Sequence, residues 1–414
     1  MLRKRVIQGG MLFLLSSCCS LIHAATLVVG STSVCSNATY ATISAALFAA
    51  APSDEIDVCP GIYTEQLVIT QPVTLHGISG DGSQRVLIQP SSITNVQNPV
   101  NQQQNIPPFQ AAISVVNTSN VTIDGLAIDD SNNSVTGCGT TLAVIHFSNS
   151  SGAVSNNVLT GGLSTPLSCT ALFPGNGFGV QVDTSAGKTG PFSVSITGNS
   201  IHDFNRNGIL AMGAGIIAEI SGNTISGVGP TTGYNQFGVF IANGAVAYVS
   251  HNMISQGTCE TLTATACVNQ RSEGVVFRAA GPASVVDANF IASVQSGIFL
   301  NGANQAQITN NTIMNVDALD GIDIQGTAAG YFTNSVILGN SISHVWFDST
   351  HFTCGISEAS GTGVAQNLIL NNTVNDAYCG VAAVAADQAS GNTYLNTLYG
   401  TLNSALAPPP SMEP

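Results

Sequence analysis

A two-part motif recurs through most of the chain and constrains its fold more than any other feature. The first half is an asparagine, any residue and an aliphatic residue; after a loop of variable length, the second half is a glycine followed by alternating apolar residues. Recurring units of this kind are typical of repeat architectures, in which each unit buries its apolar side chains against its neighbours. The first half occurs at Asn157-Val158-Leu159, Asn199-Ser200-Ile201, Asn223-Thr224-Ile225, Asn252-Met253-Ile254, Asn289-Phe290-Ile291, Asn311-Thr312-Ile313, Asn340-Ser341-Ile342 and Asn372-Thr373-Val374. The second half occurs at Gly208-Ile209, Gly238-Val239, Gly274-Val275, Gly297-Ile298, Gly321-Ile322, Gly355-Ile356 and Gly380-Val381.

The apolar runs of this motif are short and alternate with other residues, which is the two-residue period of a β-strand. The spacing of the motif is uneven, but a solenoid tolerates this because loops at one corner lengthen without disturbing the stack. Frequent glycine and β-branched residues argue against helical repeats. The sequence therefore predicts an all-β fold, a single solenoid of stacked parallel strands over residues 25–404.

The recurrent asparagines are predicted to be structural. An asparagine ahead of a strand adopts a left-handed turn conformation more readily than most residues, and its amide can bond the equivalent amide of the neighbouring coil. We therefore expect an asparagine ladder along the solenoid, with no ligand bound to it.

The two ends of the solenoid are predicted to differ. Residues 40–51 have one apolar face and are followed by Pro52, so we expect a short helix there. This helix would cap the N-terminal end, which would otherwise expose core side chains and strand edges. The apolar face consists of Ile43, Ala46, Leu47 and Ala50. Residues 405–414 include three consecutive prolines, Pro408, Pro409 and Pro410, and are expected to form a flexible tail.

Residues 1–24 have the features of an export signal. The basic residues Arg3, Lys4 and Arg5 precede an apolar run over 11–22, and the small Ala24 offers a cleavage point. The apolar run is too short to span a membrane, and no later segment is long and apolar enough. Residues 15–18 (Leu-Ser-Ser-Cys) also fit a lipoprotein cleavage box with Cys18 as the lipidated residue. An extracytoplasmic location is expected, either soluble or anchored at Cys18.

The charge balance excludes some partners. Three of the eight basic residues lie in the leader, which leaves five against 22 acidic residues and a net charge of −17. Nucleic acid is not expected as a partner, because its binding needs clustered Lys and Arg. Anionic polysaccharides are disfavoured as well, unless Ca²⁺ bridges the two negative surfaces. No cofactor is expected, with Ca²⁺ held by Asp124, Asp129 and Asp130 as the open alternative.

Aligning the coils on the motif glycine places equivalent residues on successive coils, about 4.8 Å apart in parallel strands. This gives three columns: two that point outward after the glycine, and a pre-glycine column at the edge of that outward face. The pre-glycine column is Phe178, Asn207, Phe237, Glu273, Ser296, Asp320, Cys354 and Cys379. The middle column is Gln181, Leu210, Phe240, Val276, Phe299, Asp323, Ser357 and Ala382. The last column is Asp183, Met212, Ala242, Arg278, Asn301 and Gln325.

Eight of the ten cysteines follow the leader, and an even number in an exported chain favours disulfides. Cys354 and Cys379 occupy one column on successive coils, a spacing that suits a disulfide. Three further pairs are expected: one tying the capping helix to the first coil and two closing long loops. They are Cys35–Cys59, Cys138–Cys169 and Cys259–Cys267. No Cys-x-x-Cys pair occurs, so neither a zinc site nor a redox dithiol is expected.

Residues 35–80 resemble the start of many exported bacterial right-handed β-helix proteins, through Tyr40-Ala41-Thr42-Ile43, Val58-Cys59-Pro60-Gly61-Ile62-Tyr63 and Val73-Thr74-Leu75-His76-Gly77. The later motifs are similar to generic β-helix repeats of the pectate-lyase-like superfamily, including NosD-like proteins. The resemblance covers roughly residues 35–400 and implies a right-handed parallel β-helix. That superfamily includes lyases, hydrolases, esterases, epimerases and non-catalytic surface proteins, so the fold leaves the activity open.

The catalytic motifs of that superfamily are incomplete in this chain. Pectin methylesterases have a Gln-Asp pair and an Asp-Phe-Ile-Phe-Gly segment, and both are missing. Polygalacturonases have an Asn-Thr-Asp motif with Asp-Asp, Gly-His-Gly and Arg-Ile-Lys partners. Only residues 319–323 (Leu-Asp-Gly-Ile-Asp) echo the first of these. Lyases of this fold commonly use Lys or Arg as the base, and after the leader only Lys188 and four arginines remain.

One face of the solenoid nevertheless has the residue types that a sugar needs, since rings stack on apolar CH faces and polar groups bond hydroxyls. The candidate substrate-binding residues are Phe240, Arg278, Phe299, Asn301 and Gln325. The candidate catalytic residues are Glu273, Asp320 and Asp323. Glu273 and Asp320 would lie two coils apart, about 9–10 Å, near the upper end for an inverting glycosidase pair. The alternative is that these are scattered polar residues with the phenylalanines covered by a loop.

These observations lead to ranked hypotheses. The first is an exported, monomeric β-helix protein that engages a polysaccharide or cell-surface glycan, as a hydrolase or lyase if it is an enzyme. The second is a non-catalytic structural or adhesive solenoid. The third is a NosD-like role in metal delivery; no metal site is assigned, because His and Met are few.

Two histidine-containing segments are weaker candidates. His344, Asp348 and His351 lie near Trp346 and could bind a metal, although a solvated loop is the simpler interpretation. His202, Asp203 and Arg206 also cluster in sequence, and ordinary hydrogen bonding at a turn is expected there.

Overall fold

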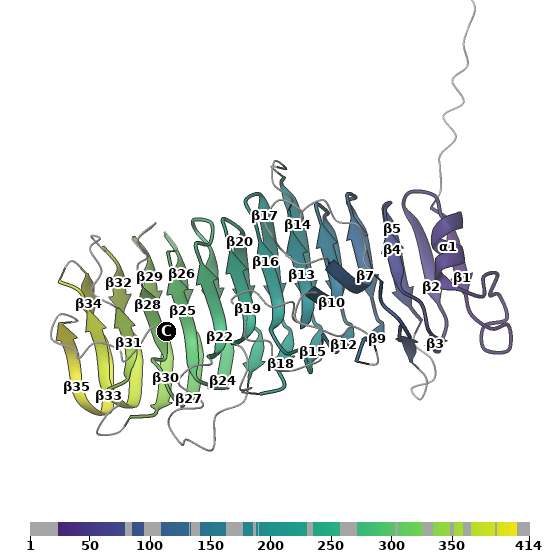
Figure 1. Ribbon diagram of the computed structural model, residues 1–414. Coiled ribbons are helices and arrows are strands. Elements are labelled where there is room, and N and C mark those ends of the chain that lie inside the picture. Colours follow the sequence, from purple (N-terminus) through teal and green to yellow (C-terminus); the bar gives the residue numbers. More distant parts are fainter. Residues whose placement is uncertain are drawn as a thin grey trace, which may run out of the picture.

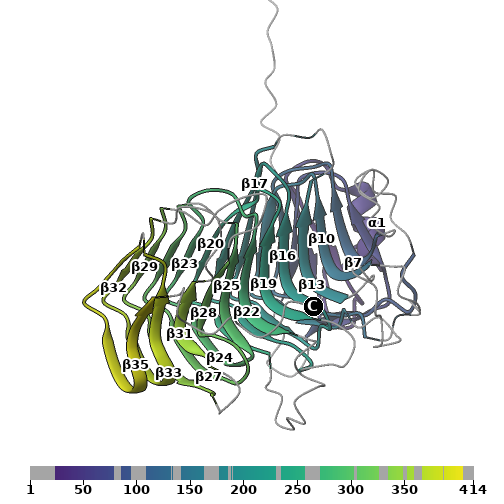
Figure 2. The same ribbon diagram turned by 60° about the vertical axis from the view of Figure 1, so that its left-hand side comes forward.

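The computed structural model contains 35 strands and one helix in its described part. The coils stack along a single axis, from the helix at the N-terminal end to the last strand (Figure 1). Turning the molecule shows the strands of successive coils in parallel rows (Figure 2). The described residues are 24–78, 85–94, 109–131, 133, 141–162, 177–184, 188, 190–229, 235–256, 271–302, 305–325, 334–347, 352–358, 366–385 and 387–403.

The first sheet takes one strand from each coil, and all of its neighbouring strands are parallel. Its strands alternate buried and more exposed residues, as in β17, because one side of the sheet faces the solenoid interior. In order they are β1 (Thr26–Val29), β2 (Asp54–Val58), β5 (Val73–Gly77), β8 (Val121–Asp124), β11 (Gly152–Ser155), β14 (Phe192–Thr197), β17 (Ile216–Ser221), β20 (Val246–Ser250), β23 (Val285–Asp287), β26 (Gln307–Thr309), β29 (Val336–Leu338), β32 (Leu368–Leu370) and β34 (Gln388–Ser390).

The second sheet has two rows, which correspond to the two halves of the sequence motif. The first row is β3 (Gly61–Tyr63), β6 (Val86–Ile88), β9 (Ala127–Asp129), β12 (Val158–Thr160), β15 (Ser200–His202), β18 (Thr224–Ser226), β21 (Met253–Ser255), β24 (Phe290–Val294), β27 (Thr312–Val316) and β30 (Ser341–Val345). The second row is β4 (Leu67–Ile69), β7 (Phe109–Val116), β10 (Thr141–Ser148), β13 (Gly177–Asp183), β16 (Asn207–Met212), β19 (Gln236–Ala242), β22 (Ser272–Arg278), β25 (Ser296–Asn301), β28 (Ile322–Gln325) and β31 (Cys354–Glu358). The long strands β33 (Thr373–Ala383) and β35 (Thr393–Asn403) belong to both rows. The predicted right-handed parallel β-helix is confirmed.

The core consists of inward columns of aliphatic side chains. Ile209, Val239, Val275, Ile298 and Ile322 follow the motif glycine on successive coils, and none of these side chains is exposed. Burying one such side chain stabilises the fold by roughly 1.5–3 kcal/mol. The core therefore extends along the whole axis, and each coil depends on its two neighbours for burial.

The motif glycine is required by a close approach between coils. A Cβ atom on Gly297 would lie 2.4 Å from the carbonyl oxygen of Gly321 and 2.5 Å from the Ile313 side chain. Both contacts are shorter than van der Waals packing allows. A side chain at this position would therefore push the second-row strand away from its neighbour.

The asparagine ladder is confirmed. The backbone N–H and the Nδ2 of Asn223 both donate to Oδ1 of Asn252, at 3.0 and 2.9 Å, and Nδ2 also donates to the Ile196 carbonyl. The same two contacts join all neighbours in the series Asn157, Asn199, Asn223, Asn252, Asn289, Asn311, Asn340, Asn372 and Asn392. The last of these, Asn392, was not recognised in the sequence.

The prediction that the ladder asparagines adopt the left-handed conformation is wrong by one position. The residues with positive φ immediately precede them, as at Gly222 (φ 64°) and His251 (φ 55°). The turn is made at the preceding residue, which leaves the asparagine buried with its amide directed at the next coil.

The N-terminal cap is helix α1 (Ile43–Ala49), shorter than the predicted 40–51. Thr42 is the N-cap, and its side chain accepts a bond from the Ala45 amide, while Ala50 is already extended. Ile43 and Ala46 are fully buried against the first coils. The predicted Cys35–Cys59 disulfide is formed beside this cap.

The C-terminal coil differs from those before it at its inward positions. Thr401 stands in register with Val381, and Thr397 stands in register with Ala377. Tyr394 replaces the aliphatic residue of the motif, and its hydroxyl lies 2.7 Å from the Thr401 hydroxyl. Polar inward positions suit a coil that faces water, as terminal repeats of solenoids do.

Candidate functional site

The strand register confirms the three predicted columns on the outward side of the second row. Phe237 pairs with Glu273, which pairs with Ser296, and Phe299 pairs with Asp323. Cys354 pairs with Cys379, and the predicted disulfide between them is formed with a Cα–Cα distance of 4.5 Å. The other predicted pairs, Cys138–Cys169 and Cys259–Cys267, lie outside the described residues.

The three candidate catalytic carboxyls lie on the same face. Ser296 separates Glu273 from Asp320 in the pre-glycine column, and its hydroxyl donates to the Asp320 backbone carbonyl. Two ladder steps correspond to about 9.5 Å between the Cα atoms of Glu273 and Asp320. Asp323 lies in β28, which follows Asp320 directly on the same coil, and it occupies the middle column. We name these three residues the carboxyl cluster.

Glu273 sits in an environment that favours its neutral form. Its side chain is almost fully buried, and this burial raises its pKa to about 7. Arg271 opposes the shift from 3.8 Å away, while the negative charge of Asp323 adds to it. A carboxyl that titrates near neutrality can hold or release a proton under physiological conditions.

Asp320 and Asp323 influence each other's protonation. Burial raises the pKa of both carboxyls, and the nearby charge of Asp323 raises that of Asp320 further. Oδ1 of Asp320 accepts a 2.5 Å bond from the backbone N–H of Cys354, so the disulfide-bonded coil holds this carboxyl in place. Gln325 donates to Oδ2 of Asp323 at 3.0 Å. Two neighbouring acids that cannot both ionise easily are a common acid–base arrangement.

The face is less open than the sequence led us to expect. Phe299 is only 8% exposed, and the Arg271 guanidinium lies 5.5 Å above its ring. Phe237 is similarly buried under Arg206. Phe299 is therefore packed beneath Arg271, and its ring face is not available for stacking on a sugar. The sequence places Phe299 in its column, but the side chain that covers the ring comes from the neighbouring coil.

The open part of the face is the last column. Arg278 is exposed at the end of β22, and Asn301 and Gln325 are half-buried on the next two coils. Phe240 is also half-buried, in the middle column. Together these four predicted binding residues place one cation, two amides and one aromatic ring beside the carboxyl cluster. We call these four residues the open row.

A second polar group lies further towards the N-terminus on the same face and was missed in the sequence. Nε2 of His146 lies 2.9 Å from Oδ2 of Asp183, and both side chains are buried. Gln181 donates to the same oxygen at 2.8 Å. His146 pairs with Gln181, and Ser148 pairs with Asp183, so the columns continue into β10. Strand β10 lacks the motif glycine, and an alignment anchored on that glycine therefore could not reach it.

The three aspartates considered for Ca²⁺ have separate surroundings. Asp124 lies in β8 and bonds to His76, Ser155 and Asn156, which lower its pKa overall although burial opposes the shift. Asp129 bonds to Gln89 and Ser131. Asp130 is buried and bonds the Gly162 amide, with its pKa raised to about 7 by burial. Within the described residues no group of three or more His, Cys, Asp or Glu side chains could hold a metal ion.

The histidine segments show only local contacts. His202 bonds Asp203 at 2.8 Å on a partly exposed turn, as expected. Arg206 instead reaches the Asn235 carbonyl and the Phe237 ring. His344 is an exposed residue of β30, and its proposed partners Asp348 and His351 lie outside the described residues.

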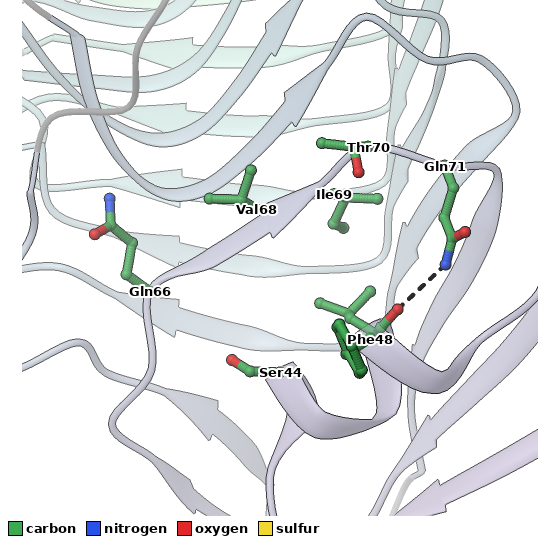
Figure 3. A pocket seen from close by; sticks show the side chains of 8 residues that line it. Ser44, Phe48, Gln66, Val68, Ile69, Thr70 and Gln71 are labelled. Atoms are coloured by element: carbon green, nitrogen blue, oxygen red, sulfur yellow. Dashed lines mark hydrogen bonds between the residues drawn. The ribbon is translucent and has the colours of Figure 1, made fainter.

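A hollow of about 360 Å³ lies elsewhere, between α1 and β4 (Figure 3). Gln71 crosses one end of it, donating to the carbonyls of Leu47 and Ala50, and Phe48 projects from the helix. Its walls carry no ionisable side chain, so it offers no acid–base chemistry. The described residues also include no helix long and apolar enough to cross a membrane.

The stacked parallel coils and the ladder define the chain as a right-handed parallel β-helix. The family model described as "Right handed beta helix region" matches residues 178–397, and the chain belongs to this family. No curated protein sequence matches the chain.

Three solved structures share the fold at low sequence identity. The A-module of the mannuronan C-5 epimerase AlgE6 from Azotobacter vinelandii is 15% identical, with 85% of this chain and 94% of that chain covered and a TM-score of 0.52. The PL6 family alginate lyase AlyGC is 15% identical, with coverage of 90% and 47% and a TM-score of 0.55. XylC, solved with xylose, is 13% identical, with coverage of 90% and 86% and a TM-score of 0.51.

Proposed function

We propose that this chain is an extracytoplasmic β-helix protein that binds a neutral polysaccharide along the open row and acts on it through the carboxyl cluster. The observation that carries the proposal is the placement of Glu273, Asp320 and Asp323 on one face, beside the exposed Arg278. The two disulfides within the described residues support a location in an oxidising compartment. The epimerase named above acts on mannuronan, the lyase acts on alginate and XylC is solved with xylose, so sugars fit this fold.

A neutral substrate is favoured by charge. The whole chain has a formal net charge of −14, and three acidic side chains gather at the proposed site. Arg271 is engaged with Glu273 and Phe299, which leaves Arg278 as the exposed cation of the open row. One cation does not offset this negative field for a chain of uronates. Hydroxyl groups, by contrast, can donate to the carboxylates and accept from the amides.

The carboxyl cluster supplies the parts that glycosidic hydrolysis needs. One carboxylic acid protonates the departing glycosidic oxygen, and a carboxylate removes a proton from the water that attacks the anomeric carbon. Inverting enzymes place these groups roughly 6.5–9.5 Å apart. The two ladder steps between Glu273 and Asp320 put their Cα atoms about 9.5 Å apart. We assign Asp320, whose pKa is raised by burial and by Asp323, to the acid and Glu273 to the base.

The second candidate is a non-catalytic structural or adhesive solenoid. It is favoured by the burial of Glu273, of which only 1% is exposed, because a general base must reach its water. In this case the open row alone would contact the partner, and no bond would be cleaved.

The test is calorimetric titration of the mature chain with xylohexaose, followed by an assay for new reducing ends. We expect saturable binding that Arg278→Ala weakens about tenfold, the loss of roughly 1.4 kcal/mol of hydrogen bonding. Arg85→Ala is the matched control, since Arg85 is an exposed arginine at the N-terminal end. Asp320→Asn should bind normally but release no reducing ends.

The outcomes separate the candidates. Binding without turnover in the wild type supports the adhesive solenoid and removes the catalytic roles. Binding that is equally unaffected by Arg278→Ala and Arg85→Ala places the glycan elsewhere. Preference for an oligomannuronate over xylohexaose contradicts the neutral substrate.

A further inference from the structure

Four aromatic side chains gather beside the disulfide at the C-terminal end of the second row. Tyr378 is at their centre, with ring centroids 4.8 Å from Phe352, 5.2 Å from Tyr399 and 6.3 Å from Phe347. The rings meet at 58–60°, so none lies flat on another. The residues come from β33, β35 and the segments that follow β30 and precede β31. We call them the aromatic cluster.

The register places this cluster in line with the carboxyl cluster. Tyr399 pairs with Cys379, which pairs with Cys354, so Tyr399 continues the pre-glycine column. Asp320 precedes Cys354 in that column, and its carboxyl accepts the Cys354 amide. Three ladder steps therefore separate Asp320 from Tyr399, about 14 Å along the solenoid axis.

The aromatic cluster is more exposed to solvent than Phe299, the ring beside the carboxyl cluster. Tyr399 is 48% exposed and Phe352 is 42% exposed, whereas Phe299 is only 8% exposed. Tyr378 carries a hydroxyl within bonding reach of Tyr399, so the patch combines ring faces with polar groups. A pyranose ring presents both an apolar CH face and hydroxyls, and tyrosine suits such a ligand because it is apolar with a polar tip.

The last coil covers the C-terminal end of the solenoid with polar inward side chains. This argues against a second copy of the chain stacking there. The inward positions of the last coil are Tyr394, Thr397 and Thr401, and the Tyr394 hydroxyl meets Thr401. The Tyr394 ring also fills the space beside Gly380 and Gly400. An end that joined another copy would continue the aliphatic columns instead.

We propose that the aromatic cluster is a distal subsite that stacks on a sugar ring of the same polysaccharide that the carboxyl cluster engages. The inference rests on the proposed function, and it adds a length requirement. Because the two clusters lie about 14 Å apart along the axis, a single ligand occupies both only when it is an extended oligosaccharide. Short sugars contact one cluster and gain nothing from the other.

The test compares Tyr399→Ala with Tyr248→Ala in calorimetric titrations with xylobiose and xylohexaose. Tyr248 is the matched control, because it is 47% exposed on β20 in the first sheet. We expect Tyr399→Ala to weaken xylohexaose binding about tenfold, with Tyr248→Ala unchanged. Tyr399→Phe, which keeps the ring, should retain most of the affinity. Xylobiose should bind the wild type and Tyr399→Ala equally.

Failure of this inference is distinct from failure of the proposed function. Xylohexaose binding that Arg278→Ala weakens and Tyr399→Ala leaves intact overturns the subsite and keeps the open row. Weakening by Tyr399→Ala alone supports the aromatic subsite and overturns the open row. Equal losses for xylobiose and xylohexaose overturn the length requirement. A dimer in sedimentation experiments that Tyr399→Ala converts to monomer shows that the cluster is a protein interface, and this also overturns the subsite.

Discussion

At the scale of single residues, position within the coil decides the chemistry of each carboxyl. Asp323 and Glu273 both point outward, yet both are buried, and this raises their pKa above ordinary values. Glu358 occupies an inward position in register with Ile324, where burial and the neighbouring Asp387 raise its pKa strongly. The native chain therefore holds protons that the unfolded chain would release, and stability depends on pH.

The first prediction concerns Glu273→Gln. A carboxyl with a raised native pKa contributes stability that is complete below its ordinary value of 4.5 and is lost as pH rises through about 7. Removing the charge should flatten this dependence, and the stability difference between about pH 5 and pH 8 should shrink by about 2 kcal/mol. Urea unfolding at both pH values measures it.

The control is Glu219→Gln, since Glu219 is exposed on β17. It should leave the pH dependence as in the wild type. A Glu273→Gln chain with an unchanged pH dependence would show that Glu273 ionises normally in the native state, and its assignment as a base poised near neutrality would fall.

At the scale of elements, the asparagine ladder and the motif glycine hold the coils in register. Each ladder asparagine satisfies a buried backbone N–H of its neighbour and ties two coils together. The glycine permits the close approach of second-row strands. Together they keep the strands aligned although the loops between them vary in length. The outward columns therefore stay continuous along the solenoid.

The second prediction tests the ladder with Asn252→Ala. This change removes the acceptor of the Asn223 backbone N–H and Nδ2 and the donor to the Ile220 carbonyl, at a cost of about 2 kcal/mol in the free energy of unfolding. Gln307→Ala serves as the control, because Gln307 is exposed on β26. Equal denaturation midpoints for the two variants would contradict the structural role of the ladder.

Much of the fold and part of the site follow from the sequence because one motif sets the register. The columns that join Glu273, Asp320 and Asp323, and the Cys354–Cys379 bond, depend only on counting from the glycine. Burial does not follow in this way, since it depends on contacts between distant segments such as Arg271 over Phe299. His146, the partner of Asp183, was missed because β10 departs from the motif.

At the scale of the whole molecule, the solenoid is a rod whose two ends are closed differently. Helix α1 covers the first coils, and polar inward residues finish the last coil. A rod of this kind displays its outward columns as one long surface. On it the open row runs beside the carboxyl cluster, and the aromatic cluster lies further towards the C-terminal end. An extended polymer is the ligand that such a surface suits best.

The most direct test of the central claim is a crystal structure of the Asp320→Asn chain with xylohexaose. The substitution is expected to prevent any turnover, and we predict ordered sugar along β22, β25 and β28, within hydrogen-bond distance of Arg278 and Asn301. Sugar ordered on the first sheet or around α1 would contradict the claim that the second-row face is the glycan site. So would crystals without bound sugar at concentrations that saturate binding in solution.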